Sequence, residues 1–69
     1  MRRFLIVIER AQGNYSAYSP DLPGCVATGK TQKQTERNMY TAMQLHLRGL
    51  SEDKLPIPTS TSLAEYVVV

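Results

Sequence analysis

The chain has 69 residues and a mass of 7.7 kDa, which is the size of one small domain. A hydrophobic fraction of 42% and a charged fraction of 20% are ordinary for a globular domain, so they argue against a disordered or fibrous protein. Eight basic and six acidic residues give a net charge of +2. Because the basic residues are scattered among acids, this charge does not indicate a nucleic-acid-binding protein.

The single cysteine excludes an internal disulfide, and no second thiol or histidine cluster could complete a structural zinc site. The first apolar run, residues 4–8, is too short for a signal core or a membrane span. We therefore expect a cytoplasmic protein with no metal, no cofactor and no membrane partner. Because chains of about 60 residues bury only about 60% of their unfolded surface, we also expect self-association as a homodimer or higher homo-oligomer.

Two strands are predicted at the start of the chain. Residues 3–9 contain a run of branched and aromatic residues that is apolar on both faces, which is typical of a central strand. Gly13 and Asn14 tolerate positive φ and favour a reversal into a second strand over residues 15–19. Each face of that second strand carries one tyrosine, so it is predicted to be half-buried at most.

A corner and a third strand follow. Pro20 lacks an amide donor and ends regular pairing, and residues 21–24, Asp-Leu-Pro-Gly, predict a turn before a strand over residues 25–28.

A helix is predicted over residues 32–48. Thr31 stands three residues before Gln34, which is the spacing of a capping box, and Gly49 can take the left-handed conformation that ends a helix. One stripe of the helix is expected to pack on the sheet, and it consists of Thr35, Met39, Ala42, Met43, His46 and Leu50.

Residues 51–62 are polar with two prolines and predict an irregular connection, and residues 63–69 predict a last strand. Because a strand–helix–strand crossover is right-handed, this last strand should run parallel to the third and lie beside the first. The predicted fold class is α+β with element order β-β-β-α-β: a four-stranded mixed sheet of order 3-2-1-4 with one helix on one face. The uncovered face is a candidate for self-association.

Few residues could carry catalysis. Cys25 and His46 are the only candidates for a nucleophile and its base, and no third orienting group is indicated, so we interpret Cys25 as a small buried residue and His46 as a structural or interface residue. Asp21 is interpreted first as the acceptor of an Asx-type turn, with a contact to a partner as the alternative and a catalytic acid last. We expect no enzyme activity.

Four tyrosines could in principle stack nucleic-acid bases, as single-strand readers do: Tyr15, Tyr18, Tyr40 and Tyr66. No basic groove accompanies them in the sequence, so they are interpreted as core or interface residues.

Residues 15–31 read Tyr-Ser-Ala-Tyr-Ser-Pro-Asp-Leu-Pro-Gly-Cys-Val-Ala-Thr-Gly-Lys-Thr, and they are followed by Asn38, Ala42, Leu45-His46-Leu47 and Pro56-Ile57-Pro58. This pattern resembles a HicB-type antitoxin domain over essentially the whole chain. The most specific part is the Asp-Leu-Pro-Gly-Cys corner followed by Gly-x-Thr and a helix.

The resemblance implies a partial, degraded ribonuclease-H-like fold without nuclease activity. It also implies a function, which is to bind and mask a small RNA-cleaving HicA-type toxin, with homodimers or larger assemblies as the active form. Many relatives continue into a DNA-binding module, whereas we expect residues 1–69 to be a single domain without one, so direct DNA binding is not expected.

We expect the partner-binding surface at the corner, and its residues are Tyr18, Pro20, Asp21, Leu22, Pro23 and Gly24. The alternative function is a solitary oligomeric domain of the same fold that binds a ligand or nucleic acid without a toxin partner. A third hypothesis, of another class, is a minimal hydrolase that uses Cys25, His46 or Asp21.

Overall fold

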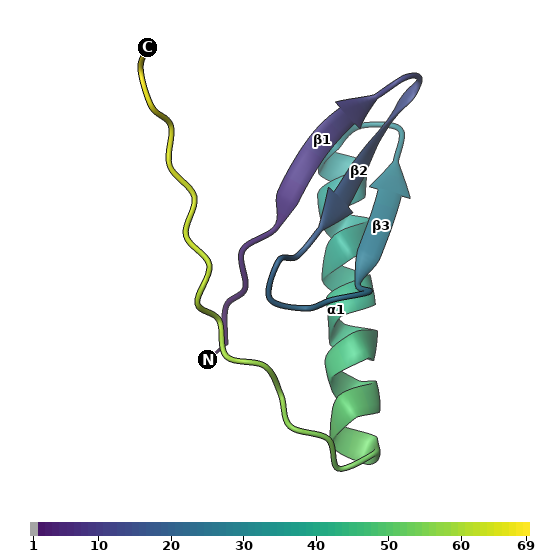
Figure 1. Cartoon of the computed structure of the whole chain (residues 1–69). Coiled ribbons are helices and arrows are strands. Elements are labelled where there is room, and N and C mark those ends of the chain that lie inside the picture. Colours follow the sequence, from purple (N-terminus) through teal and green to yellow (C-terminus); the bar gives the residue numbers. More distant parts are fainter. Residues whose placement is uncertain (1) are drawn as a thin grey trace.

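The computed structural model describes residues 2–69, and it shows a three-stranded antiparallel sheet packed against one long helix (Figure 1). The elements in chain order are β1 (Val7–Ala11), β2 (Asn14–Tyr18), β3 (Val26–Gly29) and α1 (Gln32–Glu52). Residues 53–69 return along the molecule without a regular element. The α+β class and the first four predicted elements are therefore confirmed.

β1 and β2 form a tight hairpin in which Ala11 pairs with Asn14 and Ile8 pairs with Ala17. The chain reverses through Gln12 and Gly13, and Gly13 has a φ of +80°, which favours glycine at this turn position. The predicted reversal is confirmed, with Asn14 already paired in β2.

The prediction that the first strand is central is wrong. The order of the sheet is β1-β2-β3, so β2 is central and β1 has a free edge. The β1–β2 ladder begins only at Val7, opposite Tyr18, because the residues that follow β2 turn away from β1 at Ser19 and Pro20. One side-chain bond continues past the ladder, since the Ser19 hydroxyl donates to the Leu5 carbonyl oxygen at 2.8 Å.

The core lies between one face of the sheet and α1, which packs mainly on β3 and β2 and least on β1. Its buried apolar residues are Ala17, Leu22, Cys25 and Met39, and further apolar side chains packed against them are Phe4, Ile6, Ile8, Ala27, Ala42, Met43 and Leu47. The predicted helix stripe supplies most of the helical part of this core, and Leu47 joins it from just outside the stripe.

The N-terminus of α1 is formed as predicted, because the Thr31 hydroxyl oxygen accepts a hydrogen bond from the Gln34 amide at 3.0 Å. The side chain of Gln34 does not close the second half of a capping box and instead donates to Asn38 at 3.3 Å.

The predicted helix end at Gly49 is wrong by one turn. The left-handed position is Lys54, with a φ of +57°, and α1 ends in a Schellman motif in which the Leu55 amide donates to the Leu50 carbonyl at 2.8 Å and the Lys54 amide donates to Ser51 at 3.1 Å. The two leucines occupy the positions that make the usual apolar contact of this motif, which explains why the helix runs past Gly49.

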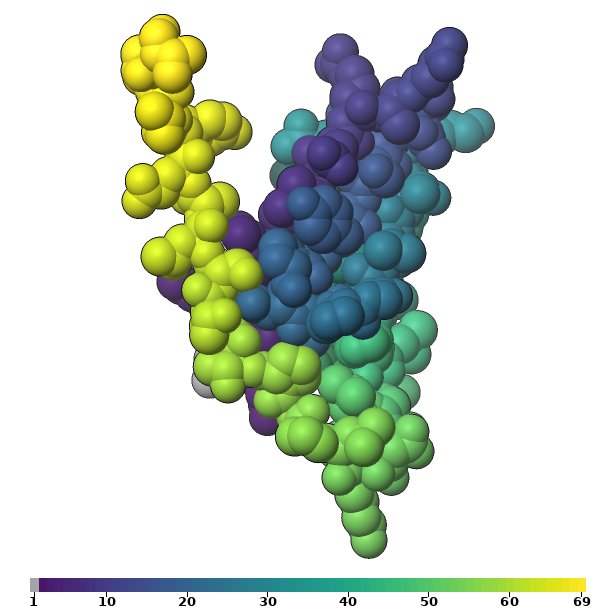
Figure 2. All heavy atoms as spheres, viewed as in Figure 1, coloured from purple at the N-terminus to yellow at the C-terminus, as the bar shows by residue number. Residues whose placement is uncertain are grey.

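The predicted fourth strand over residues 63–69 is absent from the single chain, so the order 3-2-1-4 is reduced to three strands. These residues are extended and run in the same direction as β1, but they diverge from its edge and stand apart from the body of the molecule (Figures 1 and 2). Tyr66, Val67, Val68 and Val69 are exposed.

Two glycines with opposite surroundings give a test of how closely β3 packs on α1. A Cβ at Gly29 would lie 2.6 Å from Thr35 Oγ1 and 2.7 Å from its backbone nitrogen, whereas a Cβ at Gly49 would meet nothing within 4 Å. We expect Gly49→Ala to raise the free energy of unfolding by about 0.5–1 kcal/mol, because glycine is entropically unfavourable inside a helix. We expect Gly29→Ala to lower it by about 1–3 kcal/mol through overpacking.

Urea unfolding of both variants measures these changes. Equal effects of the two substitutions would contradict the close approach of β3 to the first turn of α1.

Candidate functional site

The corner between β2 and β3 is built from two successive turns. The Leu22 amide donates to the Ser19 carbonyl at 3.1 Å, and the Cys25 amide donates to the Leu22 carbonyl at 3.1 Å. In the second turn Pro23 precedes Gly24, whose φ is +83°, and this is the residue pattern and conformation of a type II turn. The backbone of the corner is therefore defined by its own sequence and hydrogen bonds.

The structure divides the predicted partner-binding residues between the surface and the core. Leu22 is only 1% exposed and packs in the core, so its prediction as a contact residue is wrong: the turns direct its side chain inward. Tyr18 is 41% exposed, and Pro20, Pro23 and Gly24 are exposed. A rigid apolar corner therefore remains at the surface, held from beneath by Leu22.

The face of the sheet that α1 does not cover continues this corner. Val7 pairs with Tyr18 and Tyr18 pairs with Val26, so these three side chains form one row across all three strands. Val26 is 64% exposed, which leaves an apolar row open next to the corner. We call this row and the corner residues Pro20, Pro23 and Gly24 the corner surface.

Asp21 binds a distant part of the chain. One oxygen of its carboxylate, Oδ2, accepts hydrogen bonds from the backbone amides of Thr61 at 3.1 Å and Ser62 at 3.0 Å. The other, Oδ1, accepts from the two hydroxyls at 3.3 Å and 2.9 Å. The expected Asx-type turn is therefore replaced by a bond to residues about 40 positions later, and the carboxylate is already occupied within the chain.

The pKa of the Asp21 carboxyl lies below its ordinary value of 3.8. The Ser62 backbone amide is the main cause, burial acts second and in the opposite direction, and the other three bonds add to the lowering. Thr61 and Ser62 were not anticipated as site residues. The only sequence signal was the run of hydroxyl residues 59–62, which can offer side-chain and backbone donors together.

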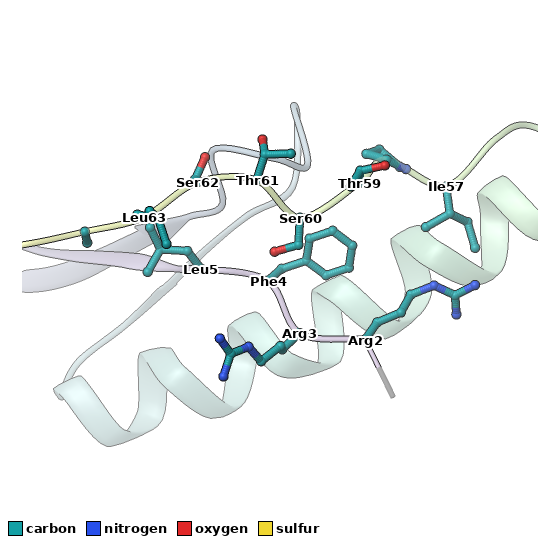
Figure 3. Close-up of a pocket in the computed structure, with 12 residues that line it drawn as sticks. Arg2, Arg3, Phe4, Leu5, Ile57, Thr59, Ser60, Thr61, Ser62 and Leu63 are labelled. Atoms are coloured by element: carbon teal, nitrogen blue, oxygen red, sulfur yellow. The ribbon is translucent and has the colours of Figure 1, made fainter.

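Residues 57–64 and residues 2–5 enclose a cleft of about 750 Å³. Figure 3 shows the two segments side by side and running in the same direction, with Phe4 and the two arginines on the N-terminal segment and the hydroxyl residues on the other. Arg2 and Arg3 give this cleft two positive charges, and Thr59 and Ser60 add hydroxyl groups. The hydroxyls of Thr61 and Ser62 are already bonded to Asp21.

A second hollow of about 480 Å³ lies between the segment that leads into β1 and the outer side of α1. Its apolar floor consists of Phe4, Ile6, Tyr40, Met43 and Leu47, and its polar rim consists of Arg2, Arg3, Glu36, Arg37 and Gln44. We call it the edge groove, because the residues on its N-terminal side lead directly into the edge strand β1.

The residues proposed for a hydrolase do not form a reactive site. Cys25 is 4% exposed, and burial raises the pKa of its thiol, which is opposite to what a cysteine nucleophile requires. His46 is half-buried on α1. Among residues 2–69, no group of three or more His, Cys, Asp and Glu side chains could hold a metal ion.

The four tyrosines do not share a stacking platform. Tyr15 and Tyr18 lie on opposite faces of β2, Tyr40 lies on α1, and Tyr66 lies on the extended segment. Tyr15 is covered by Arg10, whose guanidinium lies 5.8 Å from the ring centroid. Within the described part of the chain, no helix has the length and apolarity needed to cross a membrane.

The Asp21 bonds predict a defined dependence of stability on pH. Because the folded pKa lies below the ordinary value, the stabilisation is complete above about pH 3.8 and is lost as the pH falls through the lowered pKa. We expect Asp21→Asn to lower the unfolding temperature at neutral pH. The substitution replaces one acceptor oxygen with an NH2 group, which is a donor and faces the donor groups of Thr61 and Ser62. The difference from the wild type should shrink as the pH falls below 3.8.

Thermal unfolding between pH 2 and pH 7, roughly spanning the range in which carboxylates titrate, measures this difference. Ser62→Ala should give a smaller effect of the same sign, and Ser60→Ala, at an exposed serine that does not bond to Asp21, serves as the control. A difference for Asp21→Asn that does not change with pH would contradict this assignment.

Comparison of the chain with known proteins identifies its family. The family model described as the HicB_like antitoxin of bacterial toxin-antitoxin systems matches residues 4–68. A 14.9 kDa protein from the rep-hol intergenic region of Haemophilus phage HP1 is 32% identical over 62 residues, which are 90% of this chain and 47% of the phage protein. The chain thus spans about half of that relative. A UPF0150 protein of Helicobacter pylori is 41% identical over 49 residues, which are 71% of this chain and 68% of that protein.

A solved structure has the same fold. The HicA3 and HicB3 toxin-antitoxin complex contains a chain that superposes with a TM-score of 0.69 at 24% sequence identity, covering 84% of this chain and 71% of the other. The matching family model describes antitoxins and not enzymes. Because that model covers nearly the whole sequence, this chain belongs to the HicB-like antitoxin family of bacterial toxin-antitoxin systems.

Proposed function

We propose that this chain masks a small RNA-cleaving HicA-type toxin by direct contact, and that the corner surface makes the contact. The observation that carries the proposal is the exposed apolar corner in a chain of the antitoxin family. The similar fold in a HicA3–HicB3 complex supports a toxin as the partner.

The corner surface has the physical properties of a protein-binding site. Its backbone is held by two turns, by the buried side chain of Leu22 and by the four bonds of Asp21, so little conformational freedom is lost on binding. Tyr18 supplies an aromatic side chain at the centre, with Val7 and Val26 on the two sides, and aromatic residues are enriched at interface cores.

The small net charge of +2 supports a contact based on shape and apolar area. Asp21 is already occupied by Thr61 and Ser62, so its role in this proposal is to hold the corner and not to pair with a basic toxin. Complex formation is accordingly expected to depend weakly on salt.

We further propose that the sheet and helix form a partial ribonuclease-H-like unit, that the protein acts as a homo-oligomer, and that it acts in the cytoplasm, where a toxin would reach its RNA. The first two of these proposals depend on where residues 63–69 bind, because a fourth strand beside β1 needs that segment.

The arrangement of the two arginines favours one second candidate. Arg2 and Arg3 both line a cleft that also carries the hydroxyls of Thr59 and Ser60, and such a set suits phosphate oxygens of a nucleic acid or another anionic ligand. Under this alternative the domain binds such a ligand without a toxin. This alternative would be favoured by RNA binding that weakens steeply with rising salt and that disappears in a variant carrying both Arg2→Gln and Arg3→Gln.

Substitution of an exposed tyrosine tests the toxin contact. We expect Tyr18→Ala to weaken binding to a HicA-type toxin by about tenfold or more, because the substitution removes the aromatic centre of the corner surface. Tyr40→Ala is the matched control, since Tyr40 is also exposed, at 64%, but lies on α1. Calorimetry of the purified pair and protection of RNA from cleavage are the two measurements.

Full binding and full RNA protection by the Tyr18→Ala variant would overturn the corner as the contact surface. Failure of the wild-type chain to bind the toxin at all would overturn the proposed function itself.

A further inference from the structure

We propose that two copies of this chain exchange their C-terminal segments, so that residues 63–69 of each copy pair with the free edge of β1 in the other and fill its edge groove. Three features of the structure support this arrangement: an open strand edge, an apolar groove next to the residues that lead into it, and an extended apolar segment that pairs with no strand among residues 2–69.

The open edge begins with an apolar stretch, and Glu9 and Arg10 follow it in the second half of β1. β1 pairs only with β2, so the outer amides and carbonyls of β1 have no strand partner among residues 2–69. Residues 4–8, Phe-Leu-Ile-Val-Ile, lead into and through its first half. An apolar edge of this kind is a template for another strand unless charge, proline or a covering segment blocks it. Residues 4–8 contain neither charge nor proline, and the chain's own residues 57–64 lie beside residues 2–5 and then diverge from β1.

The edge groove gives this strand position its side-chain pockets. Phe4 and Ile6 lie on the segment that continues β1, and the remaining floor comes from α1. The groove exists because α1 packs least on β1, so the helix leaves apolar side chains uncovered beside that strand. A strand placed next to β1 would set alternate side chains into this hollow.

The segment 63–69 fits that position in composition and in length. Tyrosine and valine dominate it, and both favour strands. Leu63, Glu65, Val67 and Val69 share one face by alternation, so three apolar side chains match the apolar floor and Glu65 can meet the arginines of the rim. Seven extended residues reach about 23 Å, a typical strand length.

A second copy is a better occupant than the same chain because of the Asp21 bonds. These bonds hold Thr61 and Ser62 at the β2–β3 corner, immediately before the segment begins. From that point the segment leads away from its own β1, and in Figure 2 it stands apart from the rest of the surface. Val68 and Val69 are fully exposed, which is costly for apolar side chains in a small domain with four buried core residues.

The test compares four forms of the full chain by sedimentation equilibrium: the wild type, Val67→Pro, Val67→Thr and Val26→Lys. Val67→Pro removes one ladder donor, whereas Val67→Thr keeps the donor and a β-branched side chain. Val26 lies on the uncovered sheet face, so Val26→Lys reports the competing arrangement in which two copies pair by that face. Circular dichroism checks that each variant folds, which we expect because both valines are exposed.

We expect a wild-type dimer whose dissociation constant rises at least tenfold in Val67→Pro and changes little in the other two variants. Hydrogen exchange should show protected amides at residues 67–69 in the dimer and unprotected ones after dilution to the monomer.

A dimer that is insensitive to Val67→Pro, or one that is lost in Val26→Lys, would overturn the proposal. A wild-type chain that stays monomeric would overturn it as well, and protected amides at residues 67–69 in that monomer would show that the segment closes on its own β1.

Discussion

The hydrogen bonds from Thr61 and Ser62 to the Asp21 carboxylate are the interaction on which the arrangement of this small domain depends. The carboxylate accepts four hydrogen bonds from two residues that lie about 40 positions later, so it joins the β2–β3 corner to the returning end of the chain. Hydrogen bonds to a charged carboxylate are stronger than the same number of hydrogen bonds between neutral groups. The Asp21 carboxylate therefore fixes both the shape of the corner and the point from which residues 63–69 leave the body.

The limited size of the core explains why so much apolar surface remains outside it. In the part of the chain that the structure describes, four apolar residues are buried and one helix covers one face of a three-stranded sheet. Most of the apolar side chains that remain exposed lie in three places: the corner surface, the edge groove and the segment 63–69. Our proposals assign the first to a toxin and the other two to a second copy of the chain, so the two kinds of contact use different surfaces and can be tested separately.

The charges become meaningful only in three dimensions. Arg2 and Arg3 are adjacent in the sequence and Arg37 is distant from them, so the sequence indicates no basic patch. All three nevertheless line the edge groove. Glu65 is the one acidic residue of the segment that we place in that groove. Asp21, which looks available for a partner in the sequence, is already satisfied within the chain. The net charge of +2 is therefore a poor description of what either surface offers.

Local sequence alone determined the hairpin at Gly13, the type II turn at Pro23 and Gly24, and the start of α1 at Thr31, because each depends on residues only a few positions apart. The resemblance to HicB-type antitoxins, which spans essentially the whole chain and is most specific at the Asp-Leu-Pro-Gly-Cys corner, also predicted the family correctly. Three features were decided by tertiary structure: β1 became an edge strand, Leu22 turned into the core, and residues 63–69 stayed unpaired. Each depends on contacts between distant residues, above all the Asp21 carboxylate with Thr61 and Ser62, and no spacing or periodicity in the sequence encodes those contacts.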